Sequence, residues 1–258
     1  SVQRKEETLM QNIRLTIQYD GTRYLGWQRP EKDGLRRSVS YKINEILNRM
    51  TGEDIAIHAG ARTDPGAHAL AQTISFQTDT ALCPEEFIHG LNRYLPRDIA
   101  VLTAENAPER FRADLNAVSR TYECRICTSE IYDIFTAGFT AHCSPAPDIK
   151  LMEAAASLLT GRHDFRAFSS GRKKKGTEKS VLDIRFFQGA SCLTIQITAD
   201  DFLHQMPALI AGTLIECGSG KRSPECIPAI FGGTEKAGDP AEAKSLLLKN
   251  IQYPPSAD

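Results

Sequence analysis

The sequence predicts an α+β protein built from two halves of ferredoxin-like type. Three observations predict this class. Segments with the two-residue period of strands alternate with segments at helical spacing, and the turns between them are short, which favours antiparallel pairing over parallel crossovers. The second half of the chain repeats the rhythm of the first. We therefore expect two antiparallel sheets joined into one extended sheet, helices on one face, and a ligand cleft between the halves.

The first half begins with a strand and a capped helix. Residues 13–19 alternate apolar and polar side chains, which is the pattern of a half-buried strand. Ser38 can cap a helix whose apolar residues recur at helical spacing, and Gly52 can end it. Two further strands and a helix that starts on a proline are expected at 71–78, 98–105 and 84–96.

The second half has the same ferredoxin-like or RRM-like order. Asp148 can cap a helix that stops at Gly161, and Asp201 can cap another that runs through Ile215 to Gly218. Strands are expected at 120–128, 180–187 and 192–199, the last two joined as a hairpin. We divide the chain into a flexible N-terminal tail, an N-terminal half and a C-terminal half that completes the cleft, at 1–12, 13–112 and 113–258.

Composition narrows the class of protein. Hydrophobic residues make up 41% and charged residues 24%, a profile typical of globular proteins. The sequence has neither a long apolar run nor the apolar core of a signal peptide, so we expect a cytoplasmic protein without a membrane segment. Seven cysteines form no regular framework, and Cys124 and Cys127 lie three apart on one expected strand, facing opposite sides. We therefore expect no metal site.

The densest cluster of chemically active side chains is HAGARTDPGAHA, residues 58–69, in the N-terminal half. Between one expected strand and the next it holds Arg62, Asp64 and His68, together with two glycines and a proline that restrict the backbone of a loop. One interpretation is a carboxylate kept ionised in a partly dry pocket, and the other is an ordinary turn with a surface ion pair. Phosphate-loop, dinucleotide-binding, serine-hydrolase and zinc-protease motifs are absent from the sequence.

Seven blocks occur in the order found in the TruA family of tRNA pseudouridine synthases. They are YDGTRYLGWQRP, ARTDPGAHA, FIHGLNRYLP, RTYECRI, GRHDFRAFSS, DFLHQM and the closing YP, and they extend from about residue 13 to 254. The resemblance implies an enzyme that isomerises uridine to pseudouridine without a cofactor. It also implies a homodimer that acts on tRNA, at positions 38, 39 and 40 of the anticodon arm.

The resemblance also implies roles for single residues. Asp64 matches the family's catalytic aspartate, which acts either as a nucleophile or by taking the 2′ proton. Arg62, Tyr122 and Leu246 match substrate-binding positions, and the tyrosine ring can stack on uracil. Contacts to RNA phosphates are expected from basic side chains at six positions: Arg23, Arg29, Arg120, Arg172, Lys173 and Lys174.

The sequence departs from the family at the partner of the aspartate. Relatives carry an arginine that pairs with it, and Ala208 stands at that position. Pro207 falls inside the expected helix, where it would remove a hydrogen bond and kink the helix. Three interpretations stay open. Arg62 or another cation compensates in an ordinary tRNA synthase, the chain is a paralogue that modifies another uridine or RNA, or it is a non-catalytic RNA-binding protein.

Overall fold

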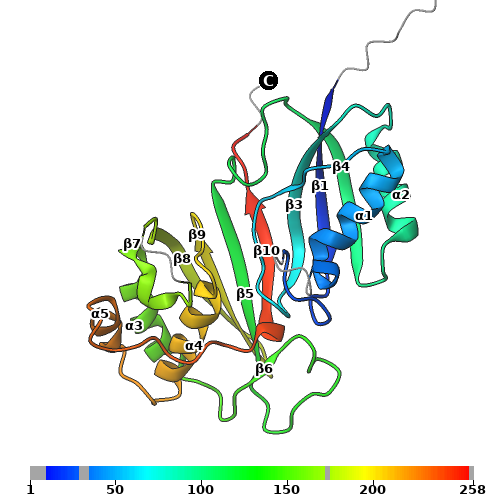
Figure 1. The fold of residues 1–258 in the computed structure, drawn as a ribbon. Helices are drawn as coiled ribbons and strands as arrows, with labels where there is room; N and C mark the ends of the chain where they lie inside the picture. The colour runs from blue at the N-terminus through cyan, green and yellow to red at the C-terminus, as the bar shows by residue number, and fades with distance from the viewer. Residues whose placement is uncertain (1–9, 29–34, 172–174, 256–258) are drawn as a thin grey trace, which may run out of the picture.

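The computed structural model describes residues 10–28, 35–171 and 175–255 (Figure 1). The strands in these ranges are β1 (Gln11–Tyr19), β2 (His58–Ala59), β3 (His68–Thr78), β4 (Ile99–Ala107), β5 (Ser119–Cys127), β6 (Ala141–His142), β7 (Gly161–Asp164), β8 (Glu178–Gln188), β9 (Cys192–Ala199) and β10 (Leu246–Gln252). The α-helices are α1 (Val39–Thr51), α2 (Pro84–Tyr94), α3 (Ile149–Leu159), α4 (Met206–Gly218) and α5 (Cys226–Phe231). No helix within the described ranges has the length and apolar character needed to cross a membrane.

One extended sheet runs through both halves of the molecule. Its strand order is β4-β1-β3-β10-β5-β9-β8-β7, and most neighbouring pairs are antiparallel. β10 joins the halves, because it pairs in parallel with β3 and antiparallel with β5 (Figure 1). The predicted α+β class with joined sheets is therefore confirmed. The joining strand β10 itself was not among the predicted strands.

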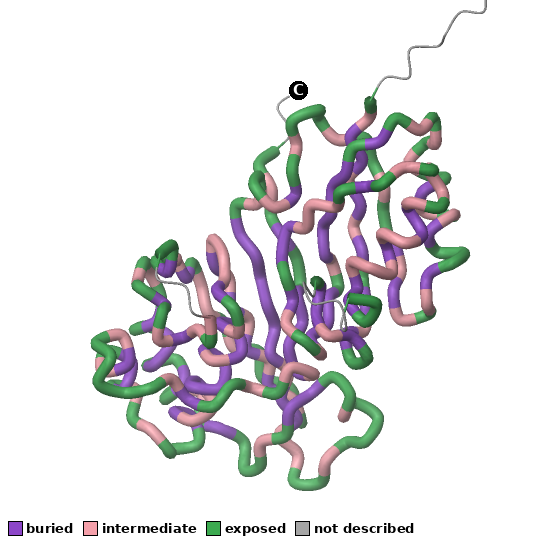
Figure 2. Tube along the Cα trace, viewed as in Figure 1, coloured by how far each residue is buried: buried purple, intermediate pink, exposed green. Residues whose placement is uncertain are grey.

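The helices of both halves cover the same face of this sheet. Tyr122 on β5 packs into the apolar cluster of the N-terminal half, whereas Cys124 and Ile126 belong to the cluster of the C-terminal half. Alternate residues of a strand face the same side, so both clusters lie on one side of β5. Figure 2 shows that most residues of β5 and β10, in the middle of the molecule, are buried. The two apolar clusters therefore meet over the central strands.

Several predicted element ends are confirmed. The Ser38 side chain accepts from the Tyr41 N–H at 3.4 Å, and Gly52 ends α1 in the left-handed conformation with φ 74°. Asp148 accepts from the Lys150 N–H at the start of α3. The hairpin of β8 and β9 is also present, with residues 189–191 between the strands. β1 begins at Gln11, two residues before the predicted strand, and most of the predicted tail (1–9) lies outside the described residues.

The predicted start of the fourth helix was wrong. Asp201 caps nothing, because its carboxylate pairs with Lys179 at 2.6 Å, and α4 begins only at Met206. Pro207 therefore occupies the first turn of α4, where the missing N–H has no intrahelical partner in any case. The predicted kink is wrong for the same reason: the proline starts the helix instead of interrupting it.

Candidate active site

Hydrogen bonds from side chains hold the residues just before Asp64 in its loop. The Gln72 amide bonds both the N–H and the carbonyl of Ala61, at 3.2 and 2.8 Å. The Thr63 hydroxyl lies 2.8 Å from the hydroxyl of Tyr19, and both residues are buried. Asp64 thus projects from a rigid segment, which agrees with the constraint predicted for residues 58–69.

A second loop, residues 20–28, packs against the Asp64 loop from behind. The Trp27 N–H donates to the Thr63 carbonyl at 3.1 Å, and the Gly66 N–H donates to the Tyr24 carbonyl at 3.1 Å. A Cβ at Gly21 would lie 1.8 Å from the carbonyl oxygen of Ala67, so no side chain fits there. The two loops therefore hold each other in one position.

The Asp64 loop opens onto a cavity of about 500 Å³ between the two halves. A cavity of this size suits one small ligand or a single flipped-out nucleoside. Its lining comes from the Asp64 loop, from β5, and from the segment between β9 and α4, and it includes Gly60, Arg62, Asp64, Tyr122, Phe202 and His204. The predicted cleft between the halves is therefore present.

Asp64 is a mostly buried carboxyl group with a histidine beside it. Its side chain is 16% exposed, and Oδ1 lies 3.5 Å from Nε2 of His204. Burial raises the pKa of the Asp64 carboxyl above its usual value, while the charge of His204 and the N–H of Gln205 act to lower it. Gln205 has φ 60°, a left-handed conformation rarely adopted by a residue with a side chain. The residue with this unusual backbone angle is thus the one whose N–H acts to lower the pKa of Asp64.

Tyr122 presents its ring to the same cavity. It lies on β5 directly opposite Leu248, and its ring packs edge-on against Phe202 at 5.1 Å between centroids. Burial raises the pKa of its hydroxyl well above the usual value, so the group stays a neutral donor at physiological pH. Within the described part of the chain this hydroxyl has no hydrogen-bond partner, which leaves it available to a ligand.

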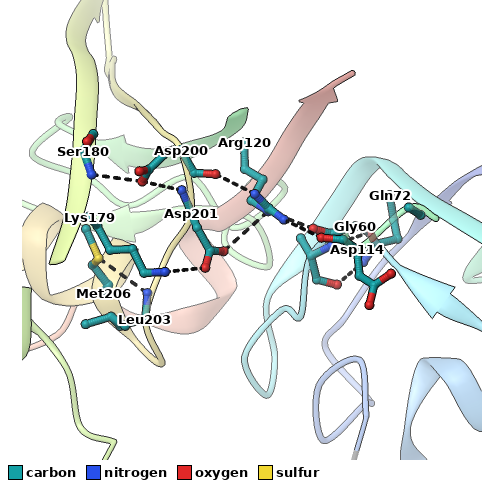
Figure 3. Close-up of polar contacts among 12 residues, drawn as sticks. Gly60, Gln72, Asp114, Arg120, Lys179, Ser180, Asp200, Asp201, Leu203 and Met206 are labelled. Carbon is teal, nitrogen blue, oxygen red and sulfur yellow. Dashed lines mark hydrogen bonds and ion pairs between the residues drawn. The ribbon is translucent and has the colours of Figure 1, made fainter. Parts of the chain in front are cut away.

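Arg120 joins three segments around the cavity (Figure 3). Its Nε donates to the Gly60 carbonyl at 2.8 Å, and its Nη1 donates to the Asp200 carbonyl at 2.5 Å. The guanidinium also lies 3.6 Å from the Asp201 carboxylate, which Lys179 contacts from the other side. Arg120 is only 8% exposed. Its donors bind the protein in this structure, which gives Arg120 a structural role, and the expected phosphate contact stays a prediction.

The other predicted residues fall in different places. Arg62 is exposed at the cavity lining. Leu246 does not line the cavity, because the first residue of β10 points into the C-terminal apolar cluster, opposite Cys124. Arg23 is exposed and pairs with Asp98 at 2.5 Å. The remaining predicted phosphate contacts lie outside the described residues: Arg29, Arg172, Lys173 and Lys174.

Sequence reasoning missed His204 and its support. His204 Nδ1 lies 2.6 Å from the Ser170 hydroxyl, and the Ser170 N–H donates to the His204 carbonyl at 3.3 Å. Both residues belong to recognised blocks, DFLHQM and GRHDFRAFSS, and neither has a local pattern that predicts contact with Asp64. Within the described ranges, His, Cys, Asp and Glu side chains form no group of three that could hold a metal ion.

Comparison with known proteins identifies the family of this chain. A family model described as tRNA pseudouridine synthase matches residues 15–116 and 155–254. The chain belongs to this family. Residues of both matched segments line the cavity, among them Asp64 from the first and His204 from the second. The predicted membership, and with it the assignment as an enzyme of the isomerase class, is confirmed.

Similar curated proteins carry the same description. The chain is 35% identical over 248 residues to "tRNA pseudouridine synthase A 2" of Clostridium tetani, covering 95% of this chain and 100% of the relative. It is 36% identical over 245 residues to "tRNA pseudouridine synthase A" of Moorella thermoacetica, covering 93% and 99%. A solved structure titled "Crystal Structure of a Cbf5-Nop10-Gar1 Complex" is a remote match, with a TM-score of 0.35 and 10% identity over 92% of this chain and 48% of the other.

Proposed function

We propose that this protein converts uridine to pseudouridine in the anticodon arm of tRNA, at positions 38 to 40, with Asp64 as the catalytic residue. The observation that carries the proposal is that the mostly buried Asp64 carboxylate and the Tyr122 ring line one cavity. Family membership supplies the reaction type, and the cavity supplies a place for a base taken out of its stack.

The reaction is an isomerisation whose atoms balance within the substrate. The bond between ribose C1′ and uracil N1 breaks, the base turns, and a bond forms between C1′ and C5. C5 then loses its proton to a base, and N1 gains a proton. Asp64 either attacks C1′ as a nucleophile or takes the 2′ proton, and both roles need the ionised carboxylate. Burial raises the pKa of the Asp64 carboxyl, and the charge of His204 and the N–H of Gln205 act against this rise.

Two other side chains act on the flipped nucleoside in this proposal. The Tyr122 ring stacks on uracil, and its neutral hydroxyl donates a hydrogen bond to a base or ribose oxygen. Arg62 is exposed where RNA would enter, and its guanidinium contacts phosphate or holds the strands apart. We further propose that the enzyme works in the cytoplasm as a homodimer.

Mapping the product tests the proposal. An anticodon stem-loop with uridine at positions 38, 39 and 40 is incubated with the protein, and pseudouridine is located by chemical labelling and primer extension. We expect pseudouridine at one or more of these positions, and none with Asp64→Asn. Conversion of another RNA with none in this arm would support the paralogue interpretation. Tight binding without conversion of any RNA would support a non-catalytic role.

A further inference from the structure

We propose that His204 is a positioning residue for the reaction: as an imidazolium held by Ser170, it supplies the positive charge that keeps Asp64 ionised and oriented. This inference rests on the proposed function and names a residue that no sequence motif assigned. It makes activity depend on a group that loses its charge as pH rises, unlike an arginine.

The position expected to provide a cation cannot do so. Ala208 is 4% exposed, belongs to the apolar cluster of the C-terminal half and lies in the first turn of α4. The carbonyl of Ala208 accepts from the Ala241 N–H at 2.9 Å, so the segment that contains Ala241 is packed against this turn. The charge that a buried carboxylate needs must therefore come from another element.

His204 is the neighbour that meets this need in the described residues. Its Nε2 lies 3.5 Å from Asp64 Oδ1, an ion-pair distance for a protonated ring. The next peptide N–H, that of Gln205, approaches the same carboxylate. The ring and this N–H therefore act on the same carboxylate, and Gln205 holds a left-handed conformation with φ 60°.

Ser170 determines the direction of the ring. The hydroxyl of Ser170 lies 2.6 Å from Nδ1, and the hydroxyl of Ser169 donates to the His204 carbonyl at 3.2 Å. A protonated imidazole donates from both nitrogens, so it can bind the serine oxygen and the carboxylate together. A neutral imidazole donates from only one nitrogen and carries no charge toward the aspartate.

Three of the other basic groups near the cavity lie on carboxylates other than Asp64, and a fourth is exposed. Charged or titratable side chains that line the cavity with His204 are Arg62, Asp64, Asp114, Arg120, Tyr122 and Asp201. Arg120 and Lys179 lie on Asp201, and Arg112 lies on Asp114 at 2.8 Å. Arg62 is exposed, and in the described residues His204 is the basic side chain that lies within ion-pair distance of Asp64.

The test is the pH profile of tritium release from C5-labelled uridine in an anticodon stem-loop, measured under single turnover. The parent protein should be active over a window, limited at low pH by protonation of Asp64 and at high pH by loss of charge on His204. His204→Gln should lower the rate on the order of 10²-fold, the cost of misplacing a reacting group. It should also remove the alkaline limb and move the acid limb to higher pH, because the carboxylate loses its charged neighbour.

Two further variants separate charge from shape. His204→Arg carries a permanent charge and should recover part of the rate without an alkaline limb. Ser170→Ala should lower the rate but keep that limb. The control His89→Gln changes an exposed histidine on α2 that does not line the cavity, and it should match the parent. A parent-like rate for His204→Gln, or an alkaline limb that persists in it, would overturn the inference.

An NMR measurement of the His204 ring nitrogens separates failure of this inference from failure of the proposed function. In Asp64→Asn the chemical shift of Nε2 should change more than that of Nδ1, because the carboxylate 3.5 Å from Nε2 is replaced by an amide. An unchanged Nε2 shift would overturn the pairing, even in an active enzyme. A changed shift in a protein that releases no tritium would support the pairing and count against the proposed reaction.

Discussion

Replacing Arg120 by methionine removes the group that ties the Asp64 loop to the segment before α4. The change leaves the carbonyl oxygens of Gly60 and Asp200 without their donors and takes one of two cations from Asp201. Unsatisfied buried acceptors cost about 1–3 kcal/mol each. The second cation, Lys179, limits the additional loss at the half-exposed carboxylate, so we expect the free energy of unfolding to fall by about 3 kcal/mol.

Urea denaturation measures this loss, and two probes locate it. Circular dichroism reports the whole sheet, and the fluorescence of Trp27, the single tryptophan, reports the loop packed against Thr63. In a thermal scan the same loss should lower Tm by roughly 6–12 °C, at about 2–4 °C per kcal/mol for a chain of this size. Arg120→Lys should recover only part of it, because an ammonium group cannot reach several acceptors in a fixed fork.

The control is Arg49→Met. Arg49 pairs with Glu45 at 2.9 Å on α1 but is 71% exposed, so its loss should cost less than about 0.5 kcal/mol. If Arg120→Met costs as little as the control, the clamp does not hold the two segments together. The structural role assigned to Arg120 would then be wrong.

Three further changes test the packing and electrostatics of the site. Gly21→Ala should lower the free energy of unfolding by about 1–3 kcal/mol and slow tritium release, because the new Cβ would meet the Ala67 carbonyl. The control Gly138→Ala has open space around it and should leave the stability unchanged. Equal stabilities of the two variants would contradict this. Asp64→Asn should have a larger free energy of unfolding than the parent at pH 7, measured by urea denaturation. This difference should become smaller toward pH 4. The pKa of Asp64 is higher in the folded than in the unfolded protein, so this carboxyl stabilises the fold when it is protonated, and that stabilisation is lost as pH rises. A difference between variant and parent that grows toward acid pH would contradict a raised pKa. Ala208→Arg should lower the free energy of unfolding by about 3 kcal/mol or more and should not speed the reaction, because the space around Ala208 is apolar and filled. A faster reaction would show that an arginine at this position can reach Asp64.

Local pattern predicted the elements whose signals lie within a few residues. Ser38 and Gly52 mark the ends of α1 because a cap and a left-handed glycine act on the adjacent turn. β10 escaped prediction because it is defined by partners far away in sequence: Leu248 lies between Ala69 on β3 and Tyr122 on β5. No periodicity within residues 246–252 carries that information.

The residues of the site also differ in whether nearby sequence predicts them. Asp64 and Tyr122 were predicted from their blocks, and the cavity brings them together. His204 was missed because its role depends on how the segment before α4 folds back onto the Asp64 loop. Pro207 was misjudged because the effect of a proline depends on where its helix begins. That start is fixed by Gln205 in a left-handed conformation, while Asp201 is held away by Lys179.

The most direct test of the central claim is the rate of tritium release from C5-labelled uridine in an anticodon stem-loop, compared between the parent protein and Asp64→Asn. Asparagine keeps the shape of the side chain and removes the charge, so binding of the stem-loop serves as the internal control. We predict release by the parent and none above background by the variant, with similar binding by both. Release by Asp64→Asn at the parent's rate would contradict the claim that this carboxylate performs the reaction.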